Sequence, residues 1–226
     1  MKSARTSAAL TCAALAVLPI GASAQSRRTS DPRAGTVEIA ATALWIRGYD
    51  AGNASALETR NPPTAAPLTL FSVDSKLRAA AGIEARVGVY LTRRLSLEGL
   101  FTFSRPVLRS QLSGDFESAA PTEADASVTS YVVGGSVAYH LGTGRLRPFV
   151  QGGAGYLRQL LENNDGLVAG SELHAGGGIQ YRLTNGARPL GARLGAVASV
   201  RSRSAGFEQK RHVVPAFSAG LTWRLF

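Results

Sequence analysis

The 226-residue chain contains a single cysteine, Cys12, and no apolar run of the roughly 20 residues that a membrane-spanning helix needs. Cys12 lies in a segment with the pattern of a secretory signal peptide. Lys2 and Arg5 precede a short apolar run over residues 8–20, and Ala22-Ser23-Ala24 forms an A-x-A cleavage pattern. We expect residues 1–24 to be removed. The mature chain would then have no disulfides and no thiolate metal sites.

Lysine is also scarce, with three lysines among the 25 basic residues. The formal charge is +10, and removal of Lys2 and Arg5 leaves 10 − 2 = +8 on the mature chain. A basic protein can bind nucleic acid, but export and the scatter of the arginines along the chain argue against nucleic acid. A negatively charged membrane surface is the partner that we expect. The length of the mature chain suits one domain.

Alternation of apolar and polar residues is the dominant pattern in the rest of the chain. In residues 77–91, LRAAAGIEARVGVYL, the odd positions are apolar, whereas Arg78, Glu84 and Arg86 share the even positions. A period of two predicts a strand with one apolar face. Seven further segments alternate in the same way: residues 36–46, 95–104, 130–141, 146–157, 172–183, 189–201 and 212–226.

The connections between these eight segments alternate between short and long. Residues 92–94, 142–145 and 184–188 are short, and GTGR and TNGAR within them have the glycine and asparagine of hairpin turns. Residues 47–76, 105–129, 158–171 and 202–211 are longer and hold most of the proline, asparagine, aspartate and serine clusters that are typical of loops. The sequence therefore predicts an all-β, eight-stranded antiparallel up-and-down barrel.

The polar face of the predicted strands decides between two kinds of barrel. A soluble calyx would turn its apolar face inward and bind a small apolar ligand, whereas a transmembrane barrel turns that face to lipid. Here the polar face combines small residues with charges of both signs, which suits a crowded interior of paired charges. We therefore favour a transmembrane β-barrel over residues 36–226, preceded by a short periplasmic leader over residues 25–35. The expected lumen network is Glu38, Arg78, Glu84, Arg86, Glu98, Glu172, Arg182, Arg193 and Arg224.

Aromatic residues are expected near both ends of the strands, as in the aromatic girdles of membrane barrels. Tyr139, Tyr181 and Trp223 lie toward the short turns. The residues toward the long loops are Trp45, Phe101, Phe103, Tyr131 and Tyr156.

Two segments carry a family resemblance: RPFVQGGAGYL at residues 147–157, just after a tight turn, and the closing AGLTWRLF. With the signal peptide, they make the chain resemble the small OmpA-like outer-membrane barrels of Gram-negative bacteria. The resemblance implies an outer-membrane location and recognition of the last strand by the barrel-assembly machinery. The residues implied in that recognition are Leu221, Trp223, Leu225 and Phe226.

An eight-stranded barrel has an interior that side chains fill. We therefore expect a monomer with a structural or surface-interaction role, a lumen plugged by the Arg/Glu network, and no cofactor. Two alternatives stay open, a narrow ion or small-solute channel and a lipid A-modifying enzyme. His140 and His174 fall on the lumen face, so an enzyme would depend on His212 near the last loop. Its possible neighbours there are Ser202, Ser204 and Glu208.

Two smaller features of the sequence bear on binding sites. Glu172 and His174 share a strand face, but two ligands without a third do not make a metal site. The last loop, RSRSAGFEQKRH, is basic and would lie beside the phosphates of lipopolysaccharide. The expected contacts with lipopolysaccharide are Arg201, Arg203, Lys210 and Arg211.

Overall fold

The computed structural model describes residues 31–58, 68–115, 120–161, 167–186, 188–203 and 211–225. The expected signal peptide lies outside these ranges. Within them the secondary structure is all β, and no helix is long and apolar enough to cross a membrane. The strands are β1 (Val37–Ile46), β2 (Tyr49–Glu58), β3 (Leu68–Leu77), β4 (Ala80–Tyr90), β5 (Leu95–Ser104), β6 (Val107–Ser113), β7 (Thr122–His140), β8 (Leu146–Leu161), β9 (Leu167–Arg182), β10 (Leu190–Arg203) and β11 (His212–Arg224).

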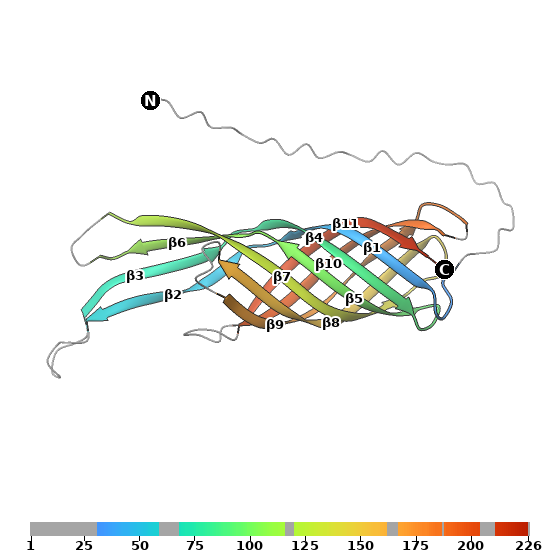
Figure 1. Ribbon diagram of the computed structural model, residues 1–226, viewed down its shortest axis with the longest axis horizontal. Coiled ribbons are helices and arrows are strands. Elements are labelled where there is room, and N and C mark those ends of the chain that lie inside the picture. The colour runs from blue at the N-terminus through green and yellow to red at the C-terminus, as the bar shows by residue number, and fades with distance from the viewer. Residues whose placement is uncertain are drawn as a thin grey trace, which may run out of the picture.

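Eight of these strands close into an antiparallel barrel in the order β1, β4, β5, β7, β8, β9, β10 and β11 (Figure 1). The last strand pairs with the first, from Glu38↔Arg224 to Ile46↔Ala216. Closure satisfies the backbone of both terminal strands, which an open sheet could not do in hydrocarbon. The predicted eight-stranded up-and-down barrel is confirmed.

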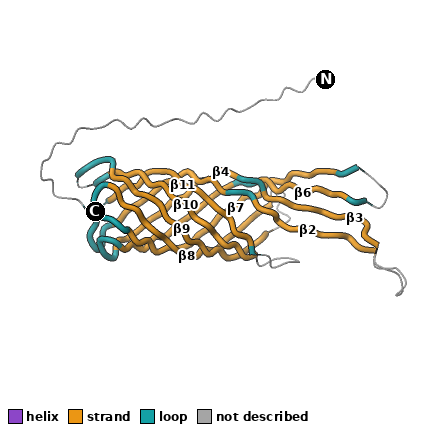
Figure 2. The backbone as a smooth tube through the Cα atoms, turned by 180° about the vertical axis from the view of Figure 1, so that it is seen from behind, coloured by secondary structure: helices purple, strands orange, loops and turns teal. Residues whose placement is uncertain are grey.

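The barrel's short turns gather at the end where the chain's C-terminus lies (Figure 2). They join β4 to β5, β7 to β8 and β9 to β10, as the sequence predicts. At the other end, β8 and β9 are longer than expected, reaching Leu161 and starting at Leu167.

A second sheet continues the barrel beyond this loop end (Figure 1). It consists of β2, β3, β6 and the first part of β7. The prediction of loops over residues 47–76 and 105–129 is therefore wrong for most of these residues. Serine, aspartate and alanine are frequent there, and the larger apolar residues do not form the long regular alternation that marks the barrel strands. We call this part the protruding sheet.

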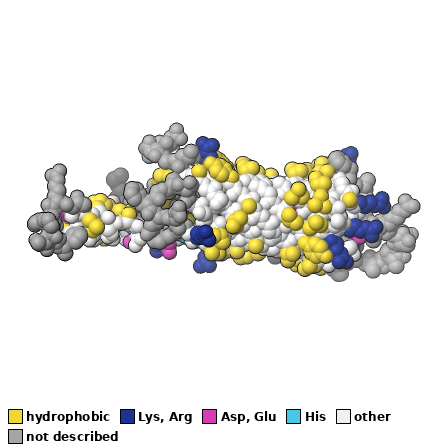
Figure 3. All heavy atoms as spheres, turned by 90° about the horizontal axis from the view of Figure 1, so that it is seen from below, with side chains coloured by type: hydrophobic (Ala, Val, Ile, Leu, Met, Phe, Trp, Pro, Cys, Tyr) yellow, Lys and Arg dark blue, Asp and Glu magenta, His cyan; other side chains and the backbone are white. Residues whose placement is uncertain are grey.

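The barrel wall is apolar outside and polar inside. Ile83, Val133 and Leu173 project from the wall with about 60% of their surface exposed (61%, 58% and 61%). Arg86 and Glu98, on the opposite face, are 6% and 5% exposed. Apolar side chains form bands around the barrel part of the surface, with Lys and Arg at their margins (Figure 3). An apolar exterior around a charged interior is the arrangement of a membrane barrel.

The protruding sheet reverses this polarity. In β7 the side that lines the lumen, with Ser130 and His140, continues as Ala124 and Ala126 beyond the barrel. The register places leucines and valine of β6 and β3 on the same side, because directly paired residues share a face. We call this side the apolar inner face. Its apolar members are Val73, Leu77, Leu108, Leu112, Ala124 and Ala126, and Ser75, Ser110 and Thr122 lie between them. Its outer face is charged, with Asp74, Lys76, Arg109, Glu123 and Asp125.

Candidate functional site: the charged lumen

A network of ion pairs crosses the middle of the barrel. Glu84 and Arg86 both point inward from β4 because they are two residues apart, and Arg86 Nε donates to Glu84 Oε1 at 2.7 Å. Arg86 Nη1 also donates to Glu98 Oε2 on β5 at 3.1 Å. Arg193 on β10 donates to both Glu98 oxygens, Nη1 to Oε1 and Nη2 to Oε2, each at 3.1 Å. The network thus joins β4 and β5 to a distant part of the wall.

Gln151 on β8 and Phe149 two residues before it complete this central cluster. Gln151 Oε1 accepts from Arg193 Nη2 at 2.7 Å and from Arg86 Nη1 at 3.3 Å. The guanidinium carbon of Arg193 lies 4.3 Å from the centre of the Phe149 ring. That ring lies against Gly178, where an added Cβ would lie 2.8 Å from Phe149 Cζ. The missing side chain makes room for a buried aromatic ring beside the charges.

A second polar cluster lies toward the turn end. Glu38 accepts hydrogen bonds from Gln180 Nε2 at 2.7 Å and from Arg224 Nε at 3.2 Å. Arg182 Nη2 donates to Asp31, in the expected leader, at 3.0 Å. The leader therefore supplies a carboxylate to this end of the lumen.

Tyr90, His140 and Arg147 form the rest of this end. Arg147 is 2% exposed, and its Nη1 donates to the Tyr90 hydroxyl at 3.2 Å. That hydroxyl also lies 3.4 Å from His140 Nε2. Within the described residues, Arg147 forms no ion pair with a carboxylate, so the hydroxyl, a backbone carbonyl and the Tyr90 ring are its partners.

Toward the loop end the lumen is lined both by a buried ion pair and by apolar side chains. Arg201 Nε donates to Glu172 Oε2 at 2.7 Å, beside a cavity of about 40 Å³ that separates this pair from the central network. Two apolar clusters also line the lumen. Leu44, Ile46 and Val214 make up one, and Leu100, Val132 and Leu157 make up the other.

Eight of the nine residues expected in the lumen network are buried there, and each of the eight is 8% exposed or less. The expectation for Arg78 is wrong, because its side chain is exposed. Arg78 and Ala79 lie between β3 and β4 and are both exposed, so the inward–outward alternation shifts by one residue at this junction.

The residues expected to contact lipopolysaccharide lie in different surroundings in the structure. Arg201 is 6% exposed and paired with Glu172 in the lumen, so its predicted contact with lipopolysaccharide is wrong. Arg201 lies in phase with Arg193 along β10, which turns both side chains inward. Arg211 is exposed. The side chain of Arg203 and all of Lys210 lie outside the described residues.

Several lumen residues were missed from the sequence, above all Arg147, Phe149 and Gln151. They occupy alternate positions of β8 and so share one face. This spacing could have predicted that the three side chains share the lumen face. Phe149 obscured the prediction, because an aromatic residue suggests the lipid face.

Two of the three histidines lie inside the lumen and one lies at the loop end. His140 and His174 are 1% and 6% exposed in the lumen, as expected, out of reach of a lipid substrate. His212 is half-buried and lies against the Tyr49 ring, with centroids 5.0 Å apart. Ser204 and Glu208 lie outside the described residues. In the described part of the chain, no three His, Cys, Asp or Glu residues group as metal ligands, and Glu172 Oε1 lies 4.0 Å from His174 Nδ1.

Apolar and aromatic side chains of the last strand face outward. Leu221 and Trp223 are 52% and 46% exposed on the outer wall. Leu225 is half-buried after the end of β11, and Phe226 lies outside the described residues. At the other end of the wall, Trp45 and Phe217 lie opposite each other in the β1–β11 register, with ring centroids 5.9 Å apart. The exposed rings therefore occur toward both ends of the strands, as the sequence predicts.

Comparison with known proteins shows which family the chain matches. Residues 10–205 match the family model of the outer membrane protein beta-barrel domain. The solved structure of the outer membrane protein OprG from Pseudomonas aeruginosa is similar, with a TM-score of 0.54 at 10% identity, over 85% of this chain and 97% of that one. Ail of Yersinia pestis (TM-score 0.46, 12% identity, 85% and 99% covered) and outer membrane protein W of E. coli (0.39, 15%, 85% and 99%) also match. No sequence among the curated proteins matches the chain.

Proposed function

Since the chain belongs to the outer membrane protein β-barrel family, and its place is therefore the outer membrane, we propose that it is a plugged barrel that presents the protruding sheet at the cell surface. Its role is structural or one of surface interaction, without chemistry of its own. In such barrels the short turns face the periplasm and the longer loops face the exterior. The protruding sheet lies at the loop end and so outside the membrane.

The observation that carries the plugged barrel is the contact between Glu98 and Arg193 with Gln151 beside them. These side chains come from β5, β10 and β8, so they bridge the lumen and leave little free space. The neighbouring cavities measure about 40 Å³ on the loop side and about 10 Å³ on the turn side. A cavity of the smaller size holds about one water molecule. A continuous column of water is therefore not supported.

The protruding sheet supports a surface role through two features. Among the described strands, β2 pairs with β3 alone, so its other edge is a place where the backbone of another chain can pair. The apolar inner face lies beside this edge and gives a partner apolar surface to bury. The lipid A enzyme is less well supported, because two of the three histidines lie inside the lumen.

Conductance of the refolded mature chain in a planar bilayer tests the plug. We expect no current steps from protein that is shown to be folded and inserted by its shifted mobility on an unheated gel. Discrete, salt-dependent steps would overturn the plugged barrel and favour the narrow channel. An Arg193→Ala variant serves as a positive control, because removal of the bridging side chain should open the lumen and produce noisy currents.

A further inference from the structure

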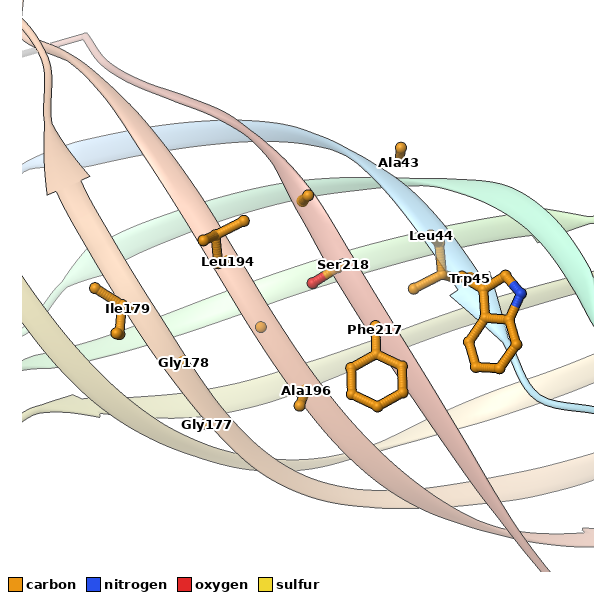
Figure 4. A pocket seen from close by; sticks show the side chains of 12 residues that line it. Ala43, Leu44, Trp45, Gly177, Gly178, Ile179, Leu194, Ala196, Phe217 and Ser218 are labelled. Atoms are coloured by element: carbon orange, nitrogen blue, oxygen red, sulfur yellow. The ribbon is translucent and has the colours of Figure 1, made fainter. Parts of the chain in front are cut away.

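An apolar groove of about 600 Å³ runs across the lipid-facing wall of β1, β11, β10 and β9 (Figure 4). Small residues such as Gly177 and Ala196 line its middle, while Trp45 and Phe217 lie toward one end and Ile179 and Leu194 toward the other. Because these side chains are small, the surface is recessed between the four large ones. The groove is therefore shaped to take an extended hydrocarbon chain.

A polar notch of about 680 Å³ lies at the loop end of the same two strands, β1 and β11. The notch exists because the sheet divides there. Pairing of β1 with β11 ends at Ile46↔Ala216, after which β2 pairs with β3 while β11 continues along β10. Arg47, Lys76 and Arg211 line the notch.

The groove leads directly to the notch along the outward face of the wall. Trp45 is in β1, and the exposed Arg47 follows directly after that strand ends at Ile46. Phe217 is in β11, and the exposed Arg211 directly precedes its first residue, with Val213 between them 64% exposed. The Arg47 backbone N–H still donates to Pro215 O at 3.0 Å, which holds the two strands together at this point. One continuous surface thus passes from apolar to basic at the level of the aromatic residues.

The charges of the notch favour an anion. Its acidic residues are Asp50 and Asp74, and Lys76 Nζ lies 3.8 Å from Asp50 Oδ1. Within the described ranges, neither Arg47 nor Arg211 forms an ion pair. Both guanidinium groups are therefore available to a phosphate, which they can bind through two parallel hydrogen bonds.

We propose that the groove and the notch together bind one phosphorylated glycolipid of the outer leaflet, a lipopolysaccharide. An acyl chain lies in the groove beside Trp45 and Phe217, and a lipid A phosphate lies in the notch between Arg47 and Arg211. The inference depends on the outer-membrane location and not on the plugged lumen or the surface role. A conducting barrel would leave it unchanged.

Native mass spectrometry of the refolded mature chain with defined lipids tests the proposal. We expect one diphosphorylated lipid A to stay bound per barrel. In the double variant Arg47→Gln, Arg211→Gln its affinity should fall by about tenfold or more, the change for loss of a charged hydrogen bond. The matched control, Arg94→Gln with Arg188→Gln, removes two exposed arginines of the turn end and should bind as the unaltered chain does.

A second variant tests the groove separately. Ala196→Phe fills the groove without touching the arginines and should weaken lipid A binding while the barrel keeps its folded gel mobility. Equal binding by the double-arginine variant would overturn the proposal. Binding of dephosphorylated lipid A, or of phosphatidylglycerol at the same concentration, as tightly as diphosphorylated lipid A would also overturn it. The wall would then bind lipid without selecting the phosphorylated glycolipid.

Discussion

Glu98 on β5 and Arg193 on β10 form a two-fold hydrogen-bonded ion pair, with both nitrogen–oxygen distances at 3.1 Å. In the barrel order, β5 and β10 are separated by three strands on either side, so the pair spans the full width of the lumen. Arg86 binds the same carboxylate from a third strand. Glu98 is therefore the residue through which opposite walls of the barrel are tied together.

Replacing Glu98 with alanine should destabilise the barrel strongly, because it leaves Arg86 and Arg193 buried with less negative charge around them. The expected loss is about 3–5 kcal/mol, the range for breaking a buried ion pair by removing one partner. Urea unfolding of the refolded protein in detergent would measure it. Glu123→Ala in the protruding sheet, where the pair with Arg109 is exposed, should change the free energy of unfolding little. An unchanged midpoint for Glu98→Ala would contradict the packed network.

Gly155 on β8 should not tolerate a side chain while Val132 is present. An added Cβ would lie 2.7 Å from Val132 Cγ1, so one of the two must move. We expect Gly155→Ala to cost about 1–3 kcal/mol, as overpacking does. Gly99→Ala is the matched control, because the atom nearest to its added Cβ, Val87 O, would lie 3.8 Å away, in ordinary contact.

The double variant Gly155→Ala, Val132→Ala tests the cause of this effect. Removal of Val132 Cγ1 should relieve the contact, so the double variant should lose less stability than the sum of the two single changes. Strict additivity would mean that the cost at Gly155 comes from the backbone.

Arg109 and Asp125 in the protruding sheet should remain paired in mild acid. The hydrogen bond that Arg109 Nε donates to Asp125 Oδ1, at 2.9 Å, lowers the pKa of the Asp125 carboxyl below its usual value. A carboxyl with a lowered folded-state pKa stabilises the fold above its unfolded pKa and loses this contribution as pH falls through the folded value. Carbon-13 NMR titration of Asp125 should therefore give a lower midpoint than in the Arg109→Gln variant. Identical midpoints would show that the pair does not form in solution.

The protruding sheet should be accessible from outside intact cells. The chain's one native cysteine, Cys12, lies in the segment that we expect to be removed. A membrane-impermeant maleimide should therefore label Glu123→Cys on intact cells. It should label Thr92→Cys, in a turn at the other end of the barrel, only after the outer membrane is permeabilised. Labelling in the reverse order would invert the orientation.

Alternation along the chain determined the barrel itself. Residues 77–91 show why, since Ile83, Val87 and Val89 face lipid while Glu84 and Arg86 face the lumen, and lipid imposes this contrast on every strand. The same period places Glu38, Glu98, Arg193 and Arg224 inside, where the structure has them buried. A local pattern suffices there because each residue's side of the wall depends only on its parity within one strand.

The tertiary structure alone decided the contacts between residues of different strands. The partners of Glu98, the contact of Phe149 with Gly178, and the pairing of Arg201 with Glu172 all follow from register and barrel closure. The protruding sheet is of the same kind, because β2, β3 and β6 are stabilised by one another and lack the lipid-imposed pattern. Parity along a strand is a local property, whereas contact across a lumen requires the stagger of eight strands, and no single segment carries that information.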